Sequence, residues 1–369
     1  MKVLHINSYF SGSSFYKNLY DEQIKSGLDI DVFVPVPSSH ESSDFRLGDY
    51  TTISANHGKY DRVLFHLKHN KIYKNIIQHY DIQNYSIIHA HSLFSNGYIA
   101  MKLKQDFGIP FVVAVRNTDV NTFFKYMVYL RKLGVQILKE SDKIIFLSEP
   151  YRKKVIEKYV PVNLKTEIMN KAVVIPNGID DFWFENKGKP KECPKQKSLR
   201  LIYVGVINKN KNLTITINAI DTLQKNGWNV EFTIVGSIGD RLVYQQIKKL
   251  SYVNYVSPKT KKELIDIYRA NDIFVMPSKT ETFGLVYAEA MSQGLPVIYS
   301  KGQGFDRQFE DGEVGFAVTS TSYEEISARI LDIMYSYNSI SGNCIRRIDK
   351  FSWSNIENKY REVYEEKKI

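Results

Sequence analysis

Short apolar runs rich in β-branched residues recur along this chain, each followed by a polar turn and a segment of helical periodicity. The runs that we expect to be strands are Lys2–Asn7, Ile30–Val36, Ser86–His91, Pro110–Arg116, Lys143–Ser148, Val173–Pro176, Arg200–Gly205, Val230–Gly236, Val253–Ser257, Ile273–Pro277, Pro296–Ser300 and Gly315–Thr319. Continuous apolar strands between helices are typical of parallel sheets covered on both faces. Two such series therefore predict an α/β protein with two Rossmann-like, doubly wound domains.

A charged segment without a periodic apolar face separates the two series, which suits a chain of 369 residues that is long enough for two cores. The expected parts are a first domain over 1–184, a linker over 185–198, a second domain over 199–350 and a C-terminal helix over 351–369. Ile356, Tyr360, Val363 and Tyr364 are spaced to share one face of that helix. We expect this face to pack back on the first domain.

Composition limits the cellular compartment and the classes of binding partner that we expect. The sequence has no apolar run near the roughly 20 residues that cross a bilayer, and its start lacks the pattern of a signal peptide. Two cysteines without metal spacing fit a reducing cytoplasm. The net charge of +10 permits nucleic acid, an anionic membrane or an anionic small molecule as a partner, or it belongs to a chain that is merely lysine-rich.

The stretch 277–298, PSKTETFGLVYAEAMSQGLPVI, carries the clearest chemistry. A strand ends at Pro277, and a helix is expected from Thr282 or Phe283 to Gly294. Gly284 would let a ligand approach the backbone, and the N–H groups at the helix start would hold a phosphate. Because this loop follows a parallel strand, we expect it at the ligand-binding edge of the sheet.

Two carboxylates, Glu281 and Glu289, flank this expected phosphate position. Glu289 lies further along the helix, at about the reach from a diphosphate to its ribose, and Glu281 lies on the side where an attached sugar would project. Each carboxylate could accept hydrogen bonds from hydroxyl groups, which suits a nucleotide-sugar. The alternative is that Glu289 is a surface residue of the helix and Glu281 caps its start.

The stretch 277–298 resembles the Glu-x7-Glu signature of the retaining glycosyltransferases of family 4. Further landmarks of that family lie at 174–180, at 203–205 followed by Lys211, at 310–316 and at 88–91. The resemblance implies the GT-B fold, in which two Rossmann-like domains face each other across a cleft. It also implies that the second domain binds most of the donor and the first domain most of the acceptor.

The resemblance implies roles for individual residues. The expected catalytic residues are Glu281, His91 and Lys211, and the expected donor-binding residues are Phe283, Gly284, Leu285, Glu289, Gly205 and Lys211. The expected acceptor-side residues are Ser11, Gly12, Arg116, Asn117 and Asp119, although Thr118 or Asp119 could instead cap a helix. We also expect His89 and His91 to lie on opposite faces of their strand, with His91 toward the donor sugar.

The sequence departs from the family pattern at several positions. Val206 stands where many members have an arginine that holds the diphosphate, and Arg116 stands where many have a second histidine. Ser11-Gly-Ser-Ser14 replaces a Gly-Gly loop. Gly302-Gln-Gly-Phe305 replaces another Gly-Gly loop that precedes a glutamate, with Asp306 or Arg307 near that glutamate's place.

Two segments of the first half mix aromatic and basic residues, Arg62–Lys74 and Asn121–Lys139. At helical spacing they fit helices that lie on an anionic membrane surface, and they fit equally helices that pack on the core with a basic outer edge. Either segment could also line an acceptor groove.

Together these features favour a metal-independent, retaining hexosyltransferase that moves a sugar from a nucleotide diphosphate donor, a UDP-sugar first, to a glycan or polyprenyl-linked acceptor. Surface polysaccharide synthesis in the cytoplasm, with peripheral attachment to the inner membrane face, is the expected setting. We expect no cofactor, no metal and no nucleic-acid partner. The alternatives are a nucleotide-sugar epimerase or hydrolase on the same fold and a non-catalytic glycan-binding member.

Overall fold

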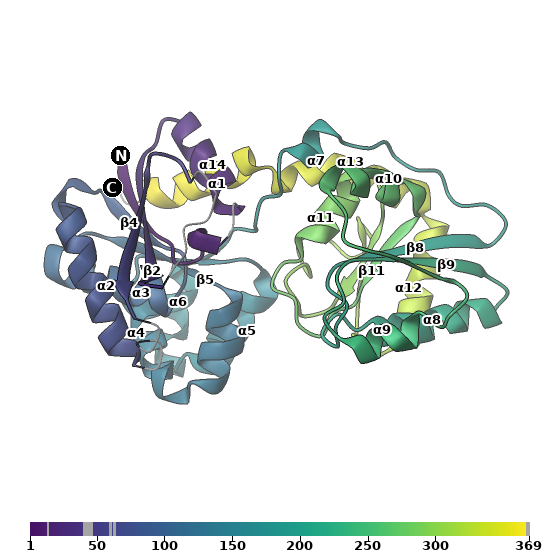
Figure 1. Ribbon diagram of the computed structural model, residues 1–369, viewed down its shortest axis with the longest axis horizontal. Helices are drawn as coiled ribbons and strands as arrows, with labels where there is room; N and C mark the ends of the chain where they lie inside the picture. The colour runs from purple at the N-terminus through teal and green to yellow at the C-terminus, as the bar shows by residue number, and fades with distance from the viewer. Residues whose placement is uncertain (13–14, 40–46, 59–60, 62–63, 367–369) are drawn as a thin grey trace. The chain divides into compact units, whose positions relative to one another are not determined.

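A computed structural model describes residues 1–12, 15–39, 47–58, 61 and 64–366. The chain forms two compact units. The first unit comprises Met1–Leu147, Tyr151–Pro176 and Trp353–Ile369, and the second comprises Ser148–Pro150 and Asn177–Ser352. Figure 1 shows both as layered α/β units, with helices packed around a central sheet.

The first unit is built on a parallel sheet with the strand order β3-β2-β1-β4-β5-β6-β7. Its strands are β1 (Lys2–Ile6), β2 (Asp29–Pro37), β3 (Thr51–His57), β4 (Ile87–Ala90), β5 (Phe111–Val115), β6 (Lys143–Phe146) and β7 (Ala172–Val174). Its helices are α1 (Phe15–Lys25), α2 (Phe65–His79), α3 (Ser95–Phe107), α4 (Arg131–Glu140), α5 (Glu149–Tyr159), α6 (Lys165–Lys171) and α14 (Trp353–Glu365). Single turns form η1 (Phe10–Gly12), η3 (Ile82–Asn84), η4 (Asp119–Phe124), η5 (Val128–Leu130) and η6 (Val162–Leu164).

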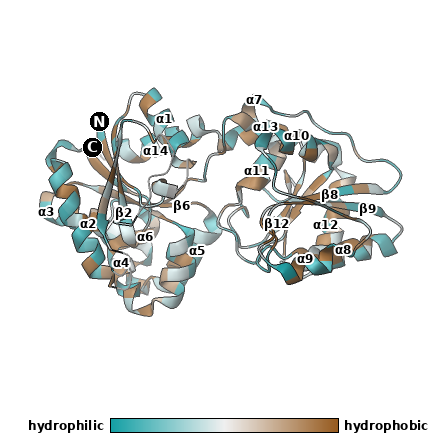
Figure 2. Ribbon diagram, in the orientation of Figure 1, coloured by the Kyte–Doolittle hydropathy of each residue, from teal (hydrophilic) through white to brown (hydrophobic). Residues whose placement is uncertain are grey.

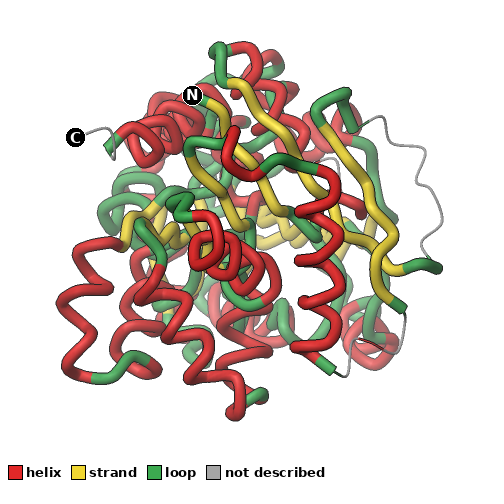
Figure 3. The backbone as a smooth tube through the Cα atoms, turned by 90° about the vertical axis from the view of Figure 1, so that its left-hand side faces the viewer, coloured by secondary structure: helices red, strands yellow, loops and turns green. Residues whose placement is uncertain are grey.

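Successive residues of the central strands enter two different cores of this unit. Leu4 and Ile6 of β1 join the core beneath α2, α3 and α4, whereas Val3 joins the core beneath α1 and α14. Figures 1 and 3 let the reader follow these helix layers around the strands. Burial on both faces explains why these strands are continuously apolar in the sequence.

The second unit has the parallel strand order β10-β9-β8-β11-β12-β13. The strands are β8 (Ser198–Val204), β9 (Asn229–Val235), β10 (Val253–Val256), β11 (Ile273–Met276), β12 (Val297–Ser300) and β13 (Gly315–Val318). The helices are α7 (Phe182–Glu185), α8 (Leu213–Lys225), α9 (Arg241–Ile247), α10 (Lys261–Ala270), α11 (Leu285–Ser292), α12 (Tyr323–Tyr335) and α13 (Tyr337–Arg347), followed by the turn η7 (Ile348–Phe351). Figure 2 shows hydrophobic strands at the centre of each unit and mixed, amphipathic helices around them.

Each strand expected from the sequence is present, so the prediction of two doubly wound units is confirmed. The strand that was missed is β3, whose sequence TTISANH is largely polar. It lies at the edge of the sheet, where only one neighbour, β2, pairs with it. An edge strand buries less of its surface, so it lacks the continuous apolar pattern of the central strands.

The expected linker differs from what the structure contains. Residues 185–198 belong to the second unit. The Gly188 N–H donates to the Ser292 carbonyl at 2.8 Å, and the Lys191 N–H donates to Ser341 Oγ at 2.7 Å. The segment is therefore a packed strap on α11 and α13, held by backbone hydrogen bonds that apolar periodicity does not signal.

Helix α14 belongs to the first unit, although the preceding residues belong to the second. Ile356, Tyr360, Val363 and Tyr364 are all buried there, so the shared face expected from their spacing is confirmed. Among the helices of the described residues, none combines the length and the apolar character that crossing a bilayer requires.

Candidate active site in the second unit

Two loops that follow neighbouring strands form the centre of the site. Strands β8 and β11 pair in parallel, so the loops that follow their carboxyl ends lie next to each other at the same end of the sheet. The Asn210 amide donates to the Thr280 carbonyl at 2.8 Å, and the Asn212 amide donates to the carbonyls of Pro277 and Ser320 at 3.0 and 2.6 Å. These asparagine side chains fix the two loops to each other before any ligand is present.

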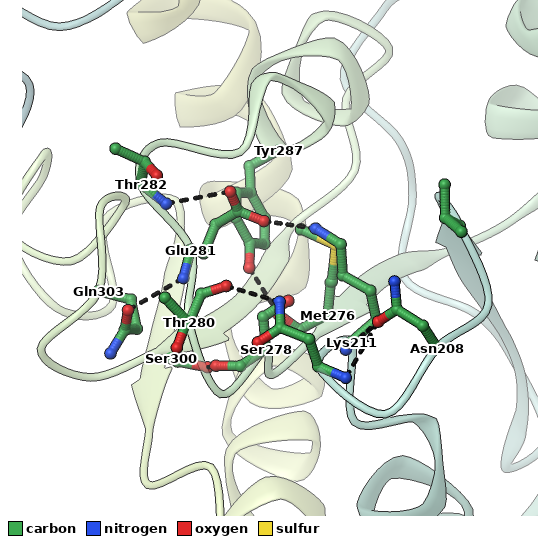
Figure 4. A network of polar contacts seen from close by, with 12 residues as sticks. Asn208, Lys211, Met276, Ser278, Thr280, Glu281, Thr282, Tyr287, Ser300 and Gln303 are labelled. Carbon is green, nitrogen blue, oxygen red and sulfur yellow. Dashed lines mark hydrogen bonds and ion pairs between the residues drawn. The ribbon is translucent and has the colours of Figure 1, made fainter. Parts of the chain in front are cut away.

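Lys211 and Glu281 meet where these loops join (Figure 4). The Lys211 Nζ lies 2.5 Å from the Glu281 Oε2, and the two side chains are 21% and 15% exposed. The Glu281 Oε1 accepts from the Thr282 N–H at 3.1 Å, and the Glu281 N–H donates to the Gln303 Oε1 at 3.0 Å. The cation and the carboxylate are thus held in one place, each within reach of a ligand.

Helix α11 begins at Leu285 rather than at Thr282 or Phe283. Gly284 precedes it with φ +78°, and a Cβ at that position would lie 2.4 Å from the Tyr287 ring. The first turn of a helix presents backbone N–H groups without intrahelical acceptors and a positive dipole end, which together attract anions. This helix start lies four residues after Glu281 in the chain, and Glu281 in turn contacts Lys211.

Of the three donor residues expected at this helix start, Phe283 has a different role. Its side chain is 2% exposed and packs against Phe305 and Phe351, with ring centroids 6.2 and 5.3 Å away. Only the backbone of Phe283 is available to a ligand. Its side chain anchors the loop in the core.

The loop after β8 begins at a glycine that passes close to a side chain of β8 itself. Gly205 has φ +153°, and a Cβ there would lie 2.8 Å from the Tyr203 hydroxyl. Val206 is 44% exposed and packs against Gly239, so an apolar side chain occupies the position expected of an arginine in the family pattern. Lys209, a nearby cation in the same loop, lies 4.0 Å from Asp240.

Glu289, in the second turn of α11, lies beside a second group of polar side chains, which consists of Tyr268, Lys261 and Asp180. Burial raises the pKa of Glu289 from its ordinary 4.5 to about 7, while Lys261 and a hydrogen bond from Tyr268 oppose this shift and Asp180 adds to it. The Tyr268 hydroxyl lies 3.5 Å from Glu289, and Lys261 pairs with Asp180 at 2.5 Å. This Asp180–Lys261 pair was not expected from the sequence, although the segment 174–180 was a recognised landmark.

In the first unit, His89 and His91 do not lie on opposite faces. Residues two apart along a strand share a face, so the expectation from their spacing was wrong. The two rings stack with centroids 4.0 Å apart at 23°. His91 is fully buried, with its Nε2 3.0 Å from the Nδ1 of His5 and 3.2 Å from the Tyr20 hydroxyl. In this structure the ring offers no surface to a sugar, which contradicts its expected contact with the donor.

The residues expected on the acceptor side divide into buried and exposed groups. Asp119 is buried and accepts from the N–H groups of Leu93, Phe94 and Arg116 at 3.0, 3.1 and 2.8 Å. Burial raises the pKa of Asp119 to about 6 against these hydrogen bonds. Asp119 therefore ties the loop after β4 to the loop after β5, and it is a structural residue rather than one that lines a groove.

Arg116 is only 6% exposed. Its Nε lies 3.4 Å from the His91 carbonyl oxygen, and its guanidinium lies 5.8 Å from the centroid of the Tyr16 ring. Asn117 is exposed, and its Oδ1 accepts from Asn121 at 2.6 Å. Ser11 and Gly12 form the turn η1, whereas Ser14 of the expected loop lies outside the described residues. Exposure thus leaves Asn117 as the clearest of these residues for contact with another molecule.

Two families match this chain over nearly its whole length. Residues 12–181 match the family described as Glycosyltransferase Family 4, and residues 185–345 match the family described as Glycosyl transferases group 1. The second match contains Glu281, Glu289 and Lys211.

Relatives of this chain include several glycosyltransferases. An uncharacterized glycosyltransferase of Methanocaldococcus jannaschii is 25% identical, over 99% of this chain and 98% of its own length. The capsular polysaccharide biosynthesis glycosyltransferase CapM of Staphylococcus aureus is 27% identical, over 69% and 71%. The alpha-monoglucosyldiacylglycerol synthase of Acholeplasma laidlawii is 26% identical, over 62% of each chain.

Solved structures share the fold over the full chain. The sucrose-phosphate synthase of Thermosynechococcus elongatus superimposes with a TM-score of 0.75 at 17% identity, covering 99% of this chain and 98% of that one. Anabaena HepE in complex with UDP-glucose superimposes with a TM-score of 0.69 at 17% identity, covering 98% and 99%. The architecture of this chain is that of the GT-B proteins.

Proposed function

Since this chain belongs to the family 4 glycosyltransferases, we propose that it is a retaining enzyme that moves a sugar from a nucleotide diphosphate donor to a hydroxyl group of a glycan or lipid-linked acceptor. In this reaction the bond between the anomeric carbon and the diphosphate oxygen breaks. The acceptor oxygen bonds to that carbon, and the hydroxyl proton leaves with the nucleoside diphosphate or with solvent. The second unit binds the donor, and the first unit binds the acceptor.

The observation that carries this proposal is the contact of Lys211 with Glu281 beside the start of α11. Negative charge grows on the diphosphate as the glycosidic bond breaks. A fixed ammonium and the N–H groups of a helix start stabilise such charge without reorganising, which lowers the barrier. An ammonium has three N–H donors, so Lys211 can contact a phosphate while it keeps Glu281 in place. Because these groups supply positive charge, we propose that no divalent cation is required.

The two glutamates are assigned different parts of the donor. We assign Glu281 to the sugar hydroxyls, because it adjoins the expected phosphate position and is oriented by Thr282 and Lys211. We assign Glu289 to the ribose hydroxyls, because it lies further along α11, beside Lys261 and Asp180. In their ionised forms both carboxylates accept hydrogen bonds from hydroxyl groups strongly, so they favour a polyol-bearing ligand over a bare phosphate.

A UDP-sugar is the first donor to test, since HepE, of the same fold, was crystallised with UDP-glucose. A surface polysaccharide or a lipid-linked glycan is the proposed acceptor, since CapM is named for capsular polysaccharide biosynthesis and another relative is named an alpha-monoglucosyldiacylglycerol synthase. We propose that Ser11, Gly12, Arg116 and Asn117 contribute to acceptor binding. The proposed setting is the cytoplasmic face of a membrane, and the free thiols of Cys193 and Cys344 suit a reducing compartment.

The test is incubation of the purified protein with UDP-, ADP- and GDP-sugars, with and without polysaccharide repeat units or lipid-linked glycans. The proposal expects nucleoside diphosphate release that depends on the acceptor, and a product whose anomeric proton coupling matches the donor. Release without any acceptor would indicate a hydrolase, an isomerised donor would indicate an epimerase, and an inverted anomer would contradict retention. The variant Lys211→Ala is the control for activity from a contaminating enzyme.

A further inference from the structure

A short surface turn of the first unit carries exposed apolar and basic side chains together. Tyr126, Val128 and Tyr129 are 68%, 59% and 73% exposed. Lys125 and Lys132, which are also exposed, flank them in the sequence KYMVYLRK. Three large apolar side chains this exposed within four residues are uncommon on a protein surface that faces only water.

The backbone of this turn is held by the core, so the exposure is not that of a loose loop. Phe124 is fully buried and stacks on Tyr159 with ring centroids 4.6 Å apart. Leu130 is also buried. The Arg131 Nε donates to the Phe124 carbonyl at 2.7 Å, which closes the turn across its base. With both ends anchored inward, Tyr126, Val128 and Tyr129 are presented outward.

The start of α2 extends this surface. Phe65 and Phe123 lie with ring centroids 6.3 Å apart, which brings the first turn of α2 against the end of η4. Leu64 and Leu67 in that turn are 58% and 47% exposed. Residues 64–68 and 125–132 thus form one apolar and basic surface, here called the docking face, on the side of the sheet where α2, α3 and α4 lie (Figure 1).

The two chain segments that contribute this surface carry charge of one sign. The sequence contains no aspartate or glutamate between residues 62 and 80 or between 120 and 139. The nearest acids along the chain have their own partners, since Asp61 pairs with Lys71 at 2.7 Å and Asp119 is buried under backbone N–H groups. Basic segments with exposed tyrosines suit an anionic surface that also accepts apolar groups.

We propose that the docking face binds the surface of an anionic lipid bilayer, with Tyr126, Val128, Tyr129 and the α2 leucines in the interfacial layer and Lys125 and Lys132 against the headgroups. Tyrosine favours this layer because its ring is apolar and its hydroxyl is polar, and lysine stems reach along apolar surface while the ammonium stays at the headgroups. The inference deepens the proposed function and rests on it in one respect only, that a lipid-linked acceptor lies in such a bilayer.

The test is co-sedimentation of the full chain with vesicles of phosphatidylcholine alone or with ~30% phosphatidylglycerol. The anionic vesicles should bind the wild-type protein at low salt and release most of it at roughly 0.5 M salt, where the Debye length is only a few ångströms. The triple variant Tyr126→Ser, Val128→Ser, Tyr129→Ser should lower the partition coefficient about tenfold or more. The double variant Lys125→Glu, Lys132→Glu should abolish the preference for anionic vesicles.

Matched controls come from the second unit. Tyr335→Ser removes a tyrosine that is 92% exposed, and Lys225→Glu with Lys249→Glu reverses two exposed lysines. Both should bind vesicles as the wild type does. No binding of the wild type, or equal binding of the triple variant, would overturn the inference. Nucleoside diphosphate binding by the same samples reports separately on the proposed function, since all these changes lie outside the donor site.

Discussion

The ammonium of Lys211 lies 2.5 Å from the carboxylate of Glu281, although seventy positions separate them in the chain. The contact exists because β8 and β11 are neighbours and their loops are joined by Asn210 and Asn212. It places a partly buried cation beside the start of α11, where the proposed diphosphate would bind.

The raised pKa of Glu289 predicts that its ionised carboxylate, which the proposed ribose contact requires, lowers the stability of the folded protein. A carboxyl group with a pKa of about 7 in the folded protein and 4.5 ordinarily binds more protons when folded between these values, so the free energy of unfolding falls as pH rises through this window. The penalty is fully present above pH 7. Glu289→Gln should therefore raise the free energy of unfolding by about 1–3 kcal/mol at pH 8 and have little effect at pH 4.5.

Thermal or urea unfolding of both proteins at the two pH values measures this difference. Glu281→Gln is the matched control, since it leaves the Lys211 ammonium without its partner and should lower stability at pH 8. An equal effect of Glu289→Gln at both pH values would mean that Glu289 is ionised normally in the folded protein.

Substitution of the two glutamates should change different kinetic constants. Glu289→Gln should raise the KM for the donor and weaken nucleoside diphosphate binding, because it removes an acceptor for hydroxyls of the nucleotide. Glu281→Gln should lower kcat at least about tenfold with a smaller change in KM, because its contacts are with the reacting sugar. Steady-state kinetics at a saturating acceptor concentration distinguishes them. Near wild-type values of kcat and KM in both variants would refute the assignment of the site.

Chelation should leave transfer intact. Lys211 and the N–H groups of α11 provide the positive charge that a divalent cation would otherwise bring to the diphosphate. We expect the same initial rate with EDTA as without it, in protein first dialysed against the chelator. A loss of activity that magnesium or manganese restores would show that the helix start and Lys211 are insufficient.

The buried polar network of the first unit should hold α14 in place. The Tyr364 hydroxyl lies 2.6 Å from the His89 Nδ1, and burial lowers the pKa of His89 well below its usual range. Tyr364→Phe would leave that ring nitrogen without its partner and should lower the free energy of unfolding by about 1–2 kcal/mol. Tyr335→Phe, at a tyrosine that is 92% exposed, is the control and should change nothing. Equal stability of the two variants would show that this contact is not stabilising.

The fold followed from the sequence because both sheets consist mainly of strands that are buried on two faces. Their apolar runs stand out, whereas the edge strand β3 buries less and was missed. The linker was misplaced because residues 185–198 pack through backbone groups, as in the Gly188 hydrogen bond to Ser292. Such contacts leave no periodic pattern in the side chains.

Some residues of the candidate site could be predicted from the sequence and others could not. Glu281, Glu289 and Lys211 could be predicted because a contiguous motif and a nearby loop carry them. The Asp180–Lys261 pair could not, since Lys261 lies outside every recognised motif and nothing in the sequence relates it to Asp180, 81 positions away. The faces of His89 and His91 were assigned wrongly because the twofold period of a strand was applied with the wrong parity. The burial of His91 depends on packing against α1, including the contact with the Tyr20 hydroxyl, which the sequence pattern does not reveal.

Val206 allows a test of the phosphate position in which a cation is added rather than removed. If the family's arginine contacts the diphosphate from this position, Val206→Arg should tighten nucleoside diphosphate binding by a few fold to about tenfold. Val206 is 44% exposed, so the longer side chain has access to solvent, although Gly239 lies against it. Isothermal titration, with the free energy of unfolding as a check on steric strain, measures the effect. Weaker binding by a variant as stable as the wild type would place the phosphate elsewhere.

The most direct test of the central claim is isothermal titration of UDP, ADP and GDP into the wild type and into Lys211→Ala. A charge-assisted hydrogen bond to a partly buried anion contributes about 1.5–3 kcal/mol, so the variant should bind the preferred diphosphate about 10- to 100-fold more weakly. The corresponding nucleoside should bind both proteins alike, because it lacks the phosphates that Lys211 contacts. Equal affinity of the two proteins for the diphosphate would contradict the site at Lys211 and α11.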